Sequence, residues 1–172
     1  MPVSSIKGKQ EIVNWMGLQH DISSILDIGP GSGTYPKLFN ATSSKLREYH
    51  WTAVEIWAPY IKQYDLNKKY HRVIIGDVCH VRLPKADCII LGDVLEHMSK
   101  KDAKKVIKRV EKFKHAIISI PVDSNSQCEA NGNAFERHIS VWTRKEMEEL
   151  FKGYKQHFIS NGVGCDIGVF LR

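Results

Sequence analysis

One short segment near the N-terminus constrains the fold more strongly than any other part of the chain. Residues 25–28 (Ile-Leu-Asp-Ile) form a largely apolar run, and Gly-Pro-Gly-Ser-Gly follows directly at 29–33. Glycine adopts backbone conformations that other residues avoid, so the turn can be sharp and can approach a ligand closely. A buried strand that ends in such a turn before a helix is typical of doubly wound α/β folds, which bind ligands at the carboxyl ends of their strands.

Apolar runs alternate with helix-like stretches along the rest of the chain. Most of these runs are continuously apolar, as in parallel strands that are buried on both faces. We expect strands at 25–28, 51–56, 72–75, 86–91, 115–120, 154–160 and 166–171, with Pro121 closing the fifth strand. The pattern predicts an α/β fold with a doubly wound, mostly parallel sheet of seven strands, helices on both faces, and a single domain over residues 1–172.

Helices are expected between these strands. The ranges are 4–16, 34–40, 59–64 and 142–151, and in the last of them Thr143 and Glu146 have the spacing of a capping box. A further helix lies between the fourth and fifth strands, where apolar residues recur at helical spacing: Ala103, Val106, Ile107, Val110 and Phe113. The stretch 121–140 has no regular pattern, and loops of that length often bind ligands.

The composition narrows the class of protein. With 42% hydrophobic and 26% charged residues, the 172-residue chain is typical of a globular domain and not of a disordered segment. No apolar run approaches the ~18 residues of a membrane-spanning helix, and the first ten residues lack the apolar core of a signal peptide. The four cysteines form no CxxC pair, which favours reduced thiols. We therefore expect a cytoplasmic protein with no membrane contact.

The net charge of +6 suggests a nucleic-acid partner, but its location weakens that interpretation. Residues 100–114 hold eight of the 25 basic residues and two of the 19 acidic ones, which leaves 17 of each in the rest of the chain. The bases are Lys100, Lys101, Lys104, Lys105, Lys108, Arg109, Lys112 and Lys114. They are predicted to occupy the helix face opposite the apolar stripe, which is usually a solvated surface.

Three acidic residues at predicted strand ends indicate the kind of ligand. The turn has the spacing G-x-G-x-G and not the G-x-G-x-x-G of dinucleotide binders. Asp27 lies two positions before the first glycine, where a carboxylate repels a pyrophosphate but suits a cationic ligand. Glu55 lies near the end of the second strand, where an acid can accept hydrogen bonds from ribose hydroxyls. Asp77 follows the third strand and can accept one from an adenine amino group.

These residues, in this order, resemble the motifs of the class I S-adenosylmethionine-dependent methyltransferases over residues 24–171. The segment 27–33 is similar to motif I, and Glu55 is similar to the ribose-binding acid. Gly76-Asp77-Val78 is similar to the adenine-contacting motif. Residues 86–97, which end in Val-Leu-Glu-His, are similar to motif IV. The resemblance implies S-adenosyl-L-methionine as the cofactor, with Gly92 and Leu95 beside the sulfonium. The cofactor-binding residues that it implies are Asp27, Gly29, Pro30, Gly31, Gly33, Glu55, Ile56, Asp77, Val78, Gly92, Asp93 and Leu95.

Three residues are candidates for catalysis. His97 follows the strand where the methyl group is expected to emerge, although a histidine at a helix start more often packs against the cofactor loop. Glu136 and His138 lie in the irregular stretch after the fifth strand, as a catalytic pair or as a structural anchor of the loop. Some O-methyltransferases bind magnesium through acids in places comparable to Asp93, Asp123 and Asn125, but the spacing does not match that group closely, and we expect no metal.

The sequence predicts an enzyme that methylates a small molecule, such as a sugar, a nucleotide derivative or another metabolite. It lacks the Asn-Pro-Pro-Tyr-like element of enzymes that methylate the exocyclic amino groups of bases, and we expect no separate recognition domain. Two alternatives stay open. One is an RNA or DNA methyltransferase that docks through the basic helix from Lys100 to Lys114. The other is a non-catalytic, cofactor-binding partner subunit. The oligomeric state is not predicted.

Overall fold

Seven strands form one sheet in the computed structural model, which describes residues 6–42, 48–124, 132–160 and 165–172. The strand order is β3-β2-β1-β4-β5-β7-β6, and β7 runs antiparallel to both of its neighbours while the other pairs are parallel. The strands are β1 (Ser24–Ile28), β2 (His50–Glu55), β3 (Arg72–Ile75), β4 (Cys88–Gly92), β5 (His115–Val122), β6 (Lys155–Ser160) and β7 (Asp166–Leu171). The predicted fold class is confirmed.

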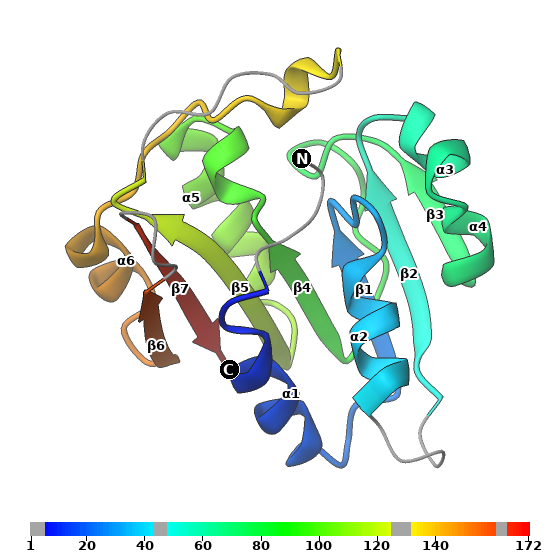
Figure 1. Cartoon of the computed structure of the whole chain (residues 1–172), viewed down its shortest axis with the longest axis horizontal. Helices are drawn as coiled ribbons and strands as arrows, with labels where there is room; N and C mark the ends of the chain where they lie inside the picture. Colours follow the sequence, from blue (N-terminus) through cyan, green and yellow to red (C-terminus); the bar gives the residue numbers. More distant parts are fainter. Residues whose placement is uncertain (1–5, 43–47, 125–131, 161–164) are drawn as a thin grey trace.

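Helices cover both faces of this sheet, as Figure 1 shows. They are α1 (Lys9–Gly17), α2 (Thr34–Thr42), α3 (Pro59–Gln63), α4 (Leu66–Lys69), α5 (Lys100–Val110) and α6 (Arg144–Leu150), with short 3₁₀ helices η1 (Leu95–His97) and η2 (Ala134–Glu136). Buried side chains of α1, α2 and α4 join one core cluster, and those of α5 and α6 join the other. None of the helices in these described ranges is long and apolar enough to cross a membrane.

Alternation along β1 sends its side chains to opposite faces and so to different helices. Leu26 and Ile28 pack in the core under α5 and α6, whereas Ile25 packs in the core under α1, α2 and α4. Because successive strand residues point to opposite faces, Asp27 lies on the same face as Ile25. This placement explains why residues of α1 and of the α4–β3 connection reach Asp27.

Helix α5 is stabilised both by burial of its apolar stripe and by a hydrogen-bonded N-cap. Ala103, Val106, Ile107 and Val110 are at most 4% exposed, and burying each larger aliphatic side chain contributes about 1.5–3 kcal/mol. Ser99 is the N-cap and its hydroxyl accepts a hydrogen bond from the Asp102 N–H. The basic residues of 100–114 therefore lie on the remaining face of α5 and after its C-terminal end.

Several predicted boundaries need correction. The first helix begins at Lys9 instead of residue 4, and the first five residues of the chain lie outside the described ranges. The fifth strand does not end before Pro121 but continues to Val122. Pro121 is tolerated because β4 stops opposite Ser119, so at Pro121 only β7 pairs with the strand. The capping box of Thr143 and Glu146 is present, and it starts α6 two residues later than predicted.

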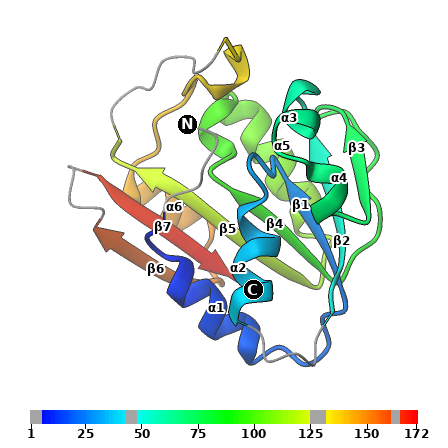
Figure 2. The same cartoon turned by 45° about the vertical axis from the view of Figure 1, so that its right-hand side comes forward.

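The carboxyl ends of the central strands form the edge where the predicted ligand site lies. Strands β2, β1 and β4 are neighbours and parallel, so their carboxyl ends meet along one edge. The glycine turn follows β1, Glu55 ends β2, and Gly92 ends β4. Figure 2 shows η2 and its flanking chain (yellow) on this side of the sheet, far from the connection between α1 and β1 at the bottom of the view.

Candidate active site

The glycine turn after β1 has the backbone conformation that its sequence requires. Gly29, Gly31 and Gly33 have φ angles of 63°, 51° and 77°, in the left-handed region. A Cβ atom at Gly29 would lie 2.9 Å from Cγ2 of Val94, and one at Gly33 would lie 2.7 Å from Cδ of Lys69. Gly29 is exposed to solvent. The turn therefore presents bare backbone at the carboxyl end of β1.

Asp27 is a buried carboxylate directly before this turn. It is 1% exposed, and its Oδ2 accepts a hydrogen bond of 2.6 Å from the Tyr70 hydroxyl. Its Oδ1 has no hydrogen-bond partner among the described residues. Burial raises the pKa of Asp27 to about 7, against the opposing effects of the Tyr70 hydrogen bond and the positive charge of Lys9. A cationic group on a ligand would meet an oxygen that the protein leaves unsatisfied.

Glu55 is the second buried acid of this edge. It is 3% exposed and its Oε1 accepts a hydrogen bond of 2.7 Å from the Trp57 N–H. Burial raises the pKa of Glu55 to about 7, and backbone N–H groups of Trp57, Gly31 and Ile56 counteract that rise. Glu55 thus lies between the end of β2 and the glycine turn after β1, where the ribose-binding acid is expected.

Asp77 holds the turn that follows β3. Its Oδ1 accepts a hydrogen bond of 2.7 Å from the Cys79 N–H, and its Oδ2 lies 3.0 Å from Nδ1 of His80. Val78 beside it is 7% exposed. The carboxylate is at the predicted edge of the sheet, and its visible contacts are with its own turn. Its predicted role toward adenine stays a prediction.

A polar network that the sequence does not predict extends beneath Gly92 and Asp93. Lys9 is 5% exposed and donates a hydrogen bond of 2.8 Å to the Tyr35 hydroxyl, which lies 3.1 Å from Oγ of Ser119. Oγ of Ser119 lies 3.4 Å from Oδ1 of Asp93. Burial lowers the pKa of Lys9, but Tyr35, Asp93 and Asp27 together raise it above its ordinary value. The network therefore places one buried positive charge under two acids of the edge.

Gly92 leaves room for this network. A Cβ atom at Gly92 would overlap the ring of Tyr35, so only glycine fits at the end of β4. Asp93 follows with a φ of 56° and donates its N–H to the Ser119 carbonyl oxygen at 2.8 Å. A non-glycine residue in this region carries backbone strain, and such strain gathers at functional sites.

The two predicted catalytic histidines lie together. The ring centroids of His97 and His138 are 5.1 Å apart, at an interplanar angle of 73°. The carbonyl oxygen of Glu96 accepts hydrogen bonds from the N–H groups of Ile139 (2.8 Å) and Ser140 (3.1 Å), which fixes the loop after η2 against η1. Burial lowers the pKa of His138, and the nearby His97 adds to the effect.

Glu136 contacts the β2 side of the carboxyl edge. Oε1 of Glu136 accepts a hydrogen bond of 3.2 Å from the Tyr60 hydroxyl of α3. In the neighbouring position, the rings of Phe135 and Trp57 have centroids 6.1 Å apart. Residues 132–140 therefore contact the chain after β2 at one end and η1 after β4 at the other. We call this segment the bridge, and Figure 1 shows it at the top of the molecule in yellow.

The alternative magnesium site finds no support. Asp123 donates its N–H to the Trp142 carbonyl oxygen and its Oδ2 lies 3.4 Å from the Arg144 N–H, so it helps to anchor the start of α6. Asn125 lies outside the described residues. Within the described part of the chain, the group of side chains that could hold a metal ion is instead Glu96, His97 and His138. Glu96 belongs to the predicted Val-Leu-Glu-His motif, but the sequence offered no sign of its burial.

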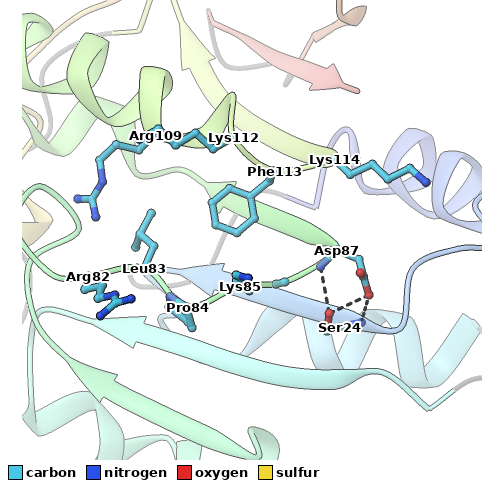
Figure 3. Close-up of a pocket in the computed structure, with 11 residues that line it drawn as sticks. Ser24, Arg82, Leu83, Pro84, Lys85, Asp87, Arg109, Lys112, Phe113 and Lys114 are labelled. Atoms are coloured by element: carbon cyan, nitrogen blue, oxygen red, sulfur yellow. Dashed lines mark hydrogen bonds between the residues drawn. The ribbon is translucent and has the colours of Figure 1, made fainter.

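The basic residues gather at the opposite edge of the sheet. A pocket of about 670 Å³ lies there, beside Ser24 and Asp87 at the amino ends of β1 and β4. Figure 3 shows the basic side chains around it: Arg82, Lys85, Arg109, Lys112 and Lys114.

Several of these bases are already engaged by the protein. Arg109 donates to the carbonyl oxygens of Val78 and Val81, and Lys114 forms an ion pair of 2.5 Å with Asp21. In the N-terminal half of α5, Lys100 forms an ion pair with Glu146 and Lys105 forms one with Asp102. Some of the excess basic residues therefore stabilise the fold, and much of the excess positive charge lies away from the carboxyl edge of the sheet.

Comparisons with known proteins agree with this architecture. Residues 26–113, just over half of the chain, match the family described as "Methyltransferase domain". The N-terminal domain of EvdMO1, solved with SAH bound, has a TM-score of 0.68 at 14% identity, over 98% of this chain and 82% of that one. No curated protein matches.

Two further solved structures are similar over most of their length. CalS10, an amino pentose methyltransferase from Micromonospora echinaspora, has a TM-score of 0.62 at 12% identity, over 95% of this chain and 89% of that one. Magnesium protoporphyrin IX methyltransferase from Synechocystis has a TM-score of 0.66 at 14% identity, over 95% and 81%. At such low identity these similarities show the fold alone.

The strand order, the glycine turn and the buried acids at strand ends define a nucleoside-binding α/β enzyme of the methyltransferase type. With the family match, the chain belongs to the methyltransferase-domain family and is a class I S-adenosylmethionine-dependent methyltransferase.

Proposed function

We propose that this methyltransferase acts on a small-molecule acceptor. The observation that carries the proposal is the bridge, which spans from Trp57 and Tyr60 after β2 to η1 after β4. Strand β1 lies between these two strands, so the bridge crosses the edge that holds the glycine turn. An edge crossed in this way admits a metabolite more readily than a folded macromolecule. Several of the structural neighbours, including CalS10, are named for small-molecule acceptors.

The residues at this edge fit the cofactor. When bound, S-adenosylmethionine supplies a methyl group on a positively charged sulfur. In our assignment, the bare backbone at Gly29 and the unsatisfied Oδ1 of Asp27 face its methionine part, and Glu55 accepts from the ribose hydroxyls. Val78 and Asp77 border the adenine, and Gly92, Asp93 and Leu95 border the sulfonium. The other implied contacts, Pro30, Gly31, Gly33 and Ile56, belong to the same two turns.

The chain's own residues would act mainly by positioning and by excluding water. Because it crosses the edge, the bridge would shield a bound ligand from solvent, and a dry site strengthens every interaction of the buried acids. Lys9, Tyr35 and Ser119 form a chain of contacts that reaches the side chain of Asp93, and the Ser119 carbonyl oxygen accepts from the Asp93 N–H. His97 and His138 lie on the β4 side of the bridge, where the acceptor is expected.

Nucleic acid is the alternative acceptor. It would require the basic pocket and α5 to guide a strand around the molecule to the opposite edge, and four bases of that region already have protein partners. Phosphate contacts make binding salt-dependent, so a nucleic-acid acceptor would bind much more weakly as salt rises.

The test is a radiolabelled methyl-transfer assay against fractionated metabolites, RNA and DNA, combined with calorimetry of S-adenosylhomocysteine binding. We expect a labelled product from a metabolite fraction, and binding that is lost in Asp27→Ala but kept in the exposed control Asp65→Ala. Label in RNA or DNA alone would overturn the small-molecule assignment. Binding without transfer to any fraction would support the non-catalytic alternative.

A further inference from the structure

Three potential metal ligands meet where the bridge joins η1. Glu96, His97 and His138 offer ligand atoms that all lie within 4.8 Å of one another. Glu96 and His97 end η1, and His138 follows η2, 41 positions later. The backbone holds the two elements together through the hydrogen bonds from Ile139 and Ser140 to the Glu96 carbonyl oxygen. The cluster therefore does not depend on its side chains for its assembly.

The cluster leaves buried polar atoms unsatisfied. Glu96 is 1% exposed, and its Oε2 has no hydrogen-bond partner in the part of the chain that the structure describes. The same is true of Nδ1 of His138. A buried polar atom without a partner costs about 1–3 kcal/mol, and a charged one costs more. A ligand that completes the cluster would remove this cost.

The electrostatic surroundings of Glu96 favour a cation. The Glu96 side chain is buried, and the negative charges of Asp93 and Glu136 act on it. No ion pair to Glu96 occurs among the described residues, where Lys and Arg side chains pair with other acids. Two further acids thus act on Glu96 electrostatically, and among the described residues no base forms an ion pair with it.

His97 is oriented as a metal-ligating histidine usually is. Its Nδ1 lies 3.1 Å from the Arg137 carbonyl oxygen, which fits an N–H donor at that atom. Nε2 is then left with its lone pair. Metal-bound histidines commonly donate their other ring N–H to a carbonyl or carboxylate, because this fixes the tautomer and the ring orientation.

We infer that Glu96, His97 and His138 bind a divalent transition-metal ion. Two imidazole nitrogens and one carboxylate oxygen suit Zn²⁺, Mn²⁺, Fe²⁺ or Co²⁺ better than Mg²⁺, which prefers oxygen ligands. With bonds of ~2.1 Å, neighbouring ligand atoms lie roughly 3–3.5 Å apart, so atoms that lie within 4.8 Å of one another would need to approach by at most about 2 Å on binding. This result would replace our sequence-based expectation of no metal.

The metal also narrows the acceptor. This part of the inference rests on the proposed function, which places the acceptor beside η1. Three protein ligands would leave coordination positions open, as in catalytic zinc sites, and a hydroxyl bound there would release its proton to water more easily. Its oxygen would then attack the methyl carbon as the carbon–sulfur bond breaks, and S-adenosylhomocysteine would leave. The acceptor class is therefore an alcohol. His97 and His138 then serve as ligands and not as proton acceptors.

The test is direct metal binding by the purified full chain, stripped with a chelator and titrated with CoCl₂ and ZnCl₂. Co²⁺ binding is followed by visible absorption and Zn²⁺ binding by calorimetry, both without any activity measurement. We expect one equivalent to bind to the wild type, and at least ~100-fold weaker binding in Glu96→Gln and His138→Gln. The matched control is His80→Gln, because His80 is an exposed histidine beside Asp77 at a distant turn. It should bind Co²⁺ as the wild type does.

Glu96→Gln also guards against a folding artefact. It removes a buried charge and keeps the side-chain shape, so its melting temperature without metal should equal or exceed that of the wild type. Added Zn²⁺ should raise the melting temperature of the wild type but not of this variant. No stoichiometric binding by the wild type, equal binding by Glu96→Gln, or binding of Mg²⁺ alone would overturn the inference.

The two proposals fail separately. S-adenosylhomocysteine binding without Co²⁺ or Zn²⁺ binding overturns only the metal site. Metal binding that depends on Glu96, in a chain that transfers no methyl group, supports the metal site and leaves the proposed function without support.

Discussion

Replacing Asp27 by asparagine should weaken the fall in the free energy of unfolding that the wild type shows as pH rises. The reason is the burial of the Asp27 carboxyl. The pKa of this carboxyl is about 7 in the folded protein and 3.8 in its ordinary state. Between these values the folded state holds a proton that the unfolded chain has released. The free energy of unfolding therefore falls as pH rises through this range, and the loss is complete above the folded pKa.

The size of this effect follows from the two pKa values. One pKa unit corresponds to about 1.4 kcal/mol, so the full loss is roughly 4 kcal/mol at high pH. Roughly 1.5 kcal/mol of it is already lost at pH 5, which leaves ~3 kcal/mol between pH 5 and pH 9. Asparagine does not titrate, and its oxygen can still accept from Tyr70. Its amide nitrogen replaces an unpartnered oxygen, which costs about 1–3 kcal/mol at every pH.

Urea denaturation of both proteins from pH 5 to pH 9 measures the prediction. Relative to the wild type, Asp27→Asn should gain roughly 3 kcal/mol of stability over this range, whatever its offset at pH 5. Glu55 has the same kind of shift and remains in both proteins, so the difference isolates Asp27. Asp65→Asn is the control, because Asp65 has a 65% exposed side chain that pairs with Lys68. A gain below ~1 kcal/mol would refute the argument from burial.

Three further predictions concern the turn, a cap and the second acid. Gly29→Ala should lower the free energy of unfolding by about 1–3 kcal/mol in urea, because alanine disfavours its positive φ and its Cβ meets Val94; an unchanged midpoint would contradict this. Thr143→Ala should cost about 1 kcal/mol in the same assay through loss of the capping box with Glu146, and no loss would show that the cap is dispensable. Glu55→Gln should weaken S-adenosylhomocysteine binding at least ~10-fold by calorimetry, since the amide replaces the carboxylate that accepts ribose hydroxyls; wild-type affinity would refute that assignment.

The central strands could be predicted from the sequence because their burial on both faces leaves continuous apolar runs, and the partly exposed β3 could be predicted because its last three residues are apolar. β3 and β7 were predicted with the bounds that the structure has, and β1 and β2 within one residue. Pro121 was misjudged because proline usually ends a strand, and only the tertiary pairing shows that β4 has already stopped there. The helix α4 was not predicted, since four residues are too few for a periodic signal.

The candidate site divides in the same way. Asp27, Glu55 and Asp77 could be placed together from the sequence, because parallel strands bring their carboxyl ends to one edge. Lys9, Tyr35 and Tyr70 could not, because they reach this edge through packing with residues 26 to 84 positions away. The adjacent Glu96 and His97 in the sequence likewise do not reveal that the Glu96 side chain is buried with an oxygen that lacks a hydrogen-bond partner among the described residues.

The two edges of the sheet thus have opposite electrostatic roles. Exposed bases lie at the amino edge, where some contribute to structure through carbonyl oxygens and surface acids. Buried acids lie at the carboxyl edge, and Asp27 and Glu96 each keep an oxygen without a partner among the described residues. Such atoms lower the stability of the free protein and persist where function requires them. A cation that pairs with either oxygen removes this unfavourable free energy. Ligands that bind at the carboxyl edge should therefore raise the free energy of unfolding.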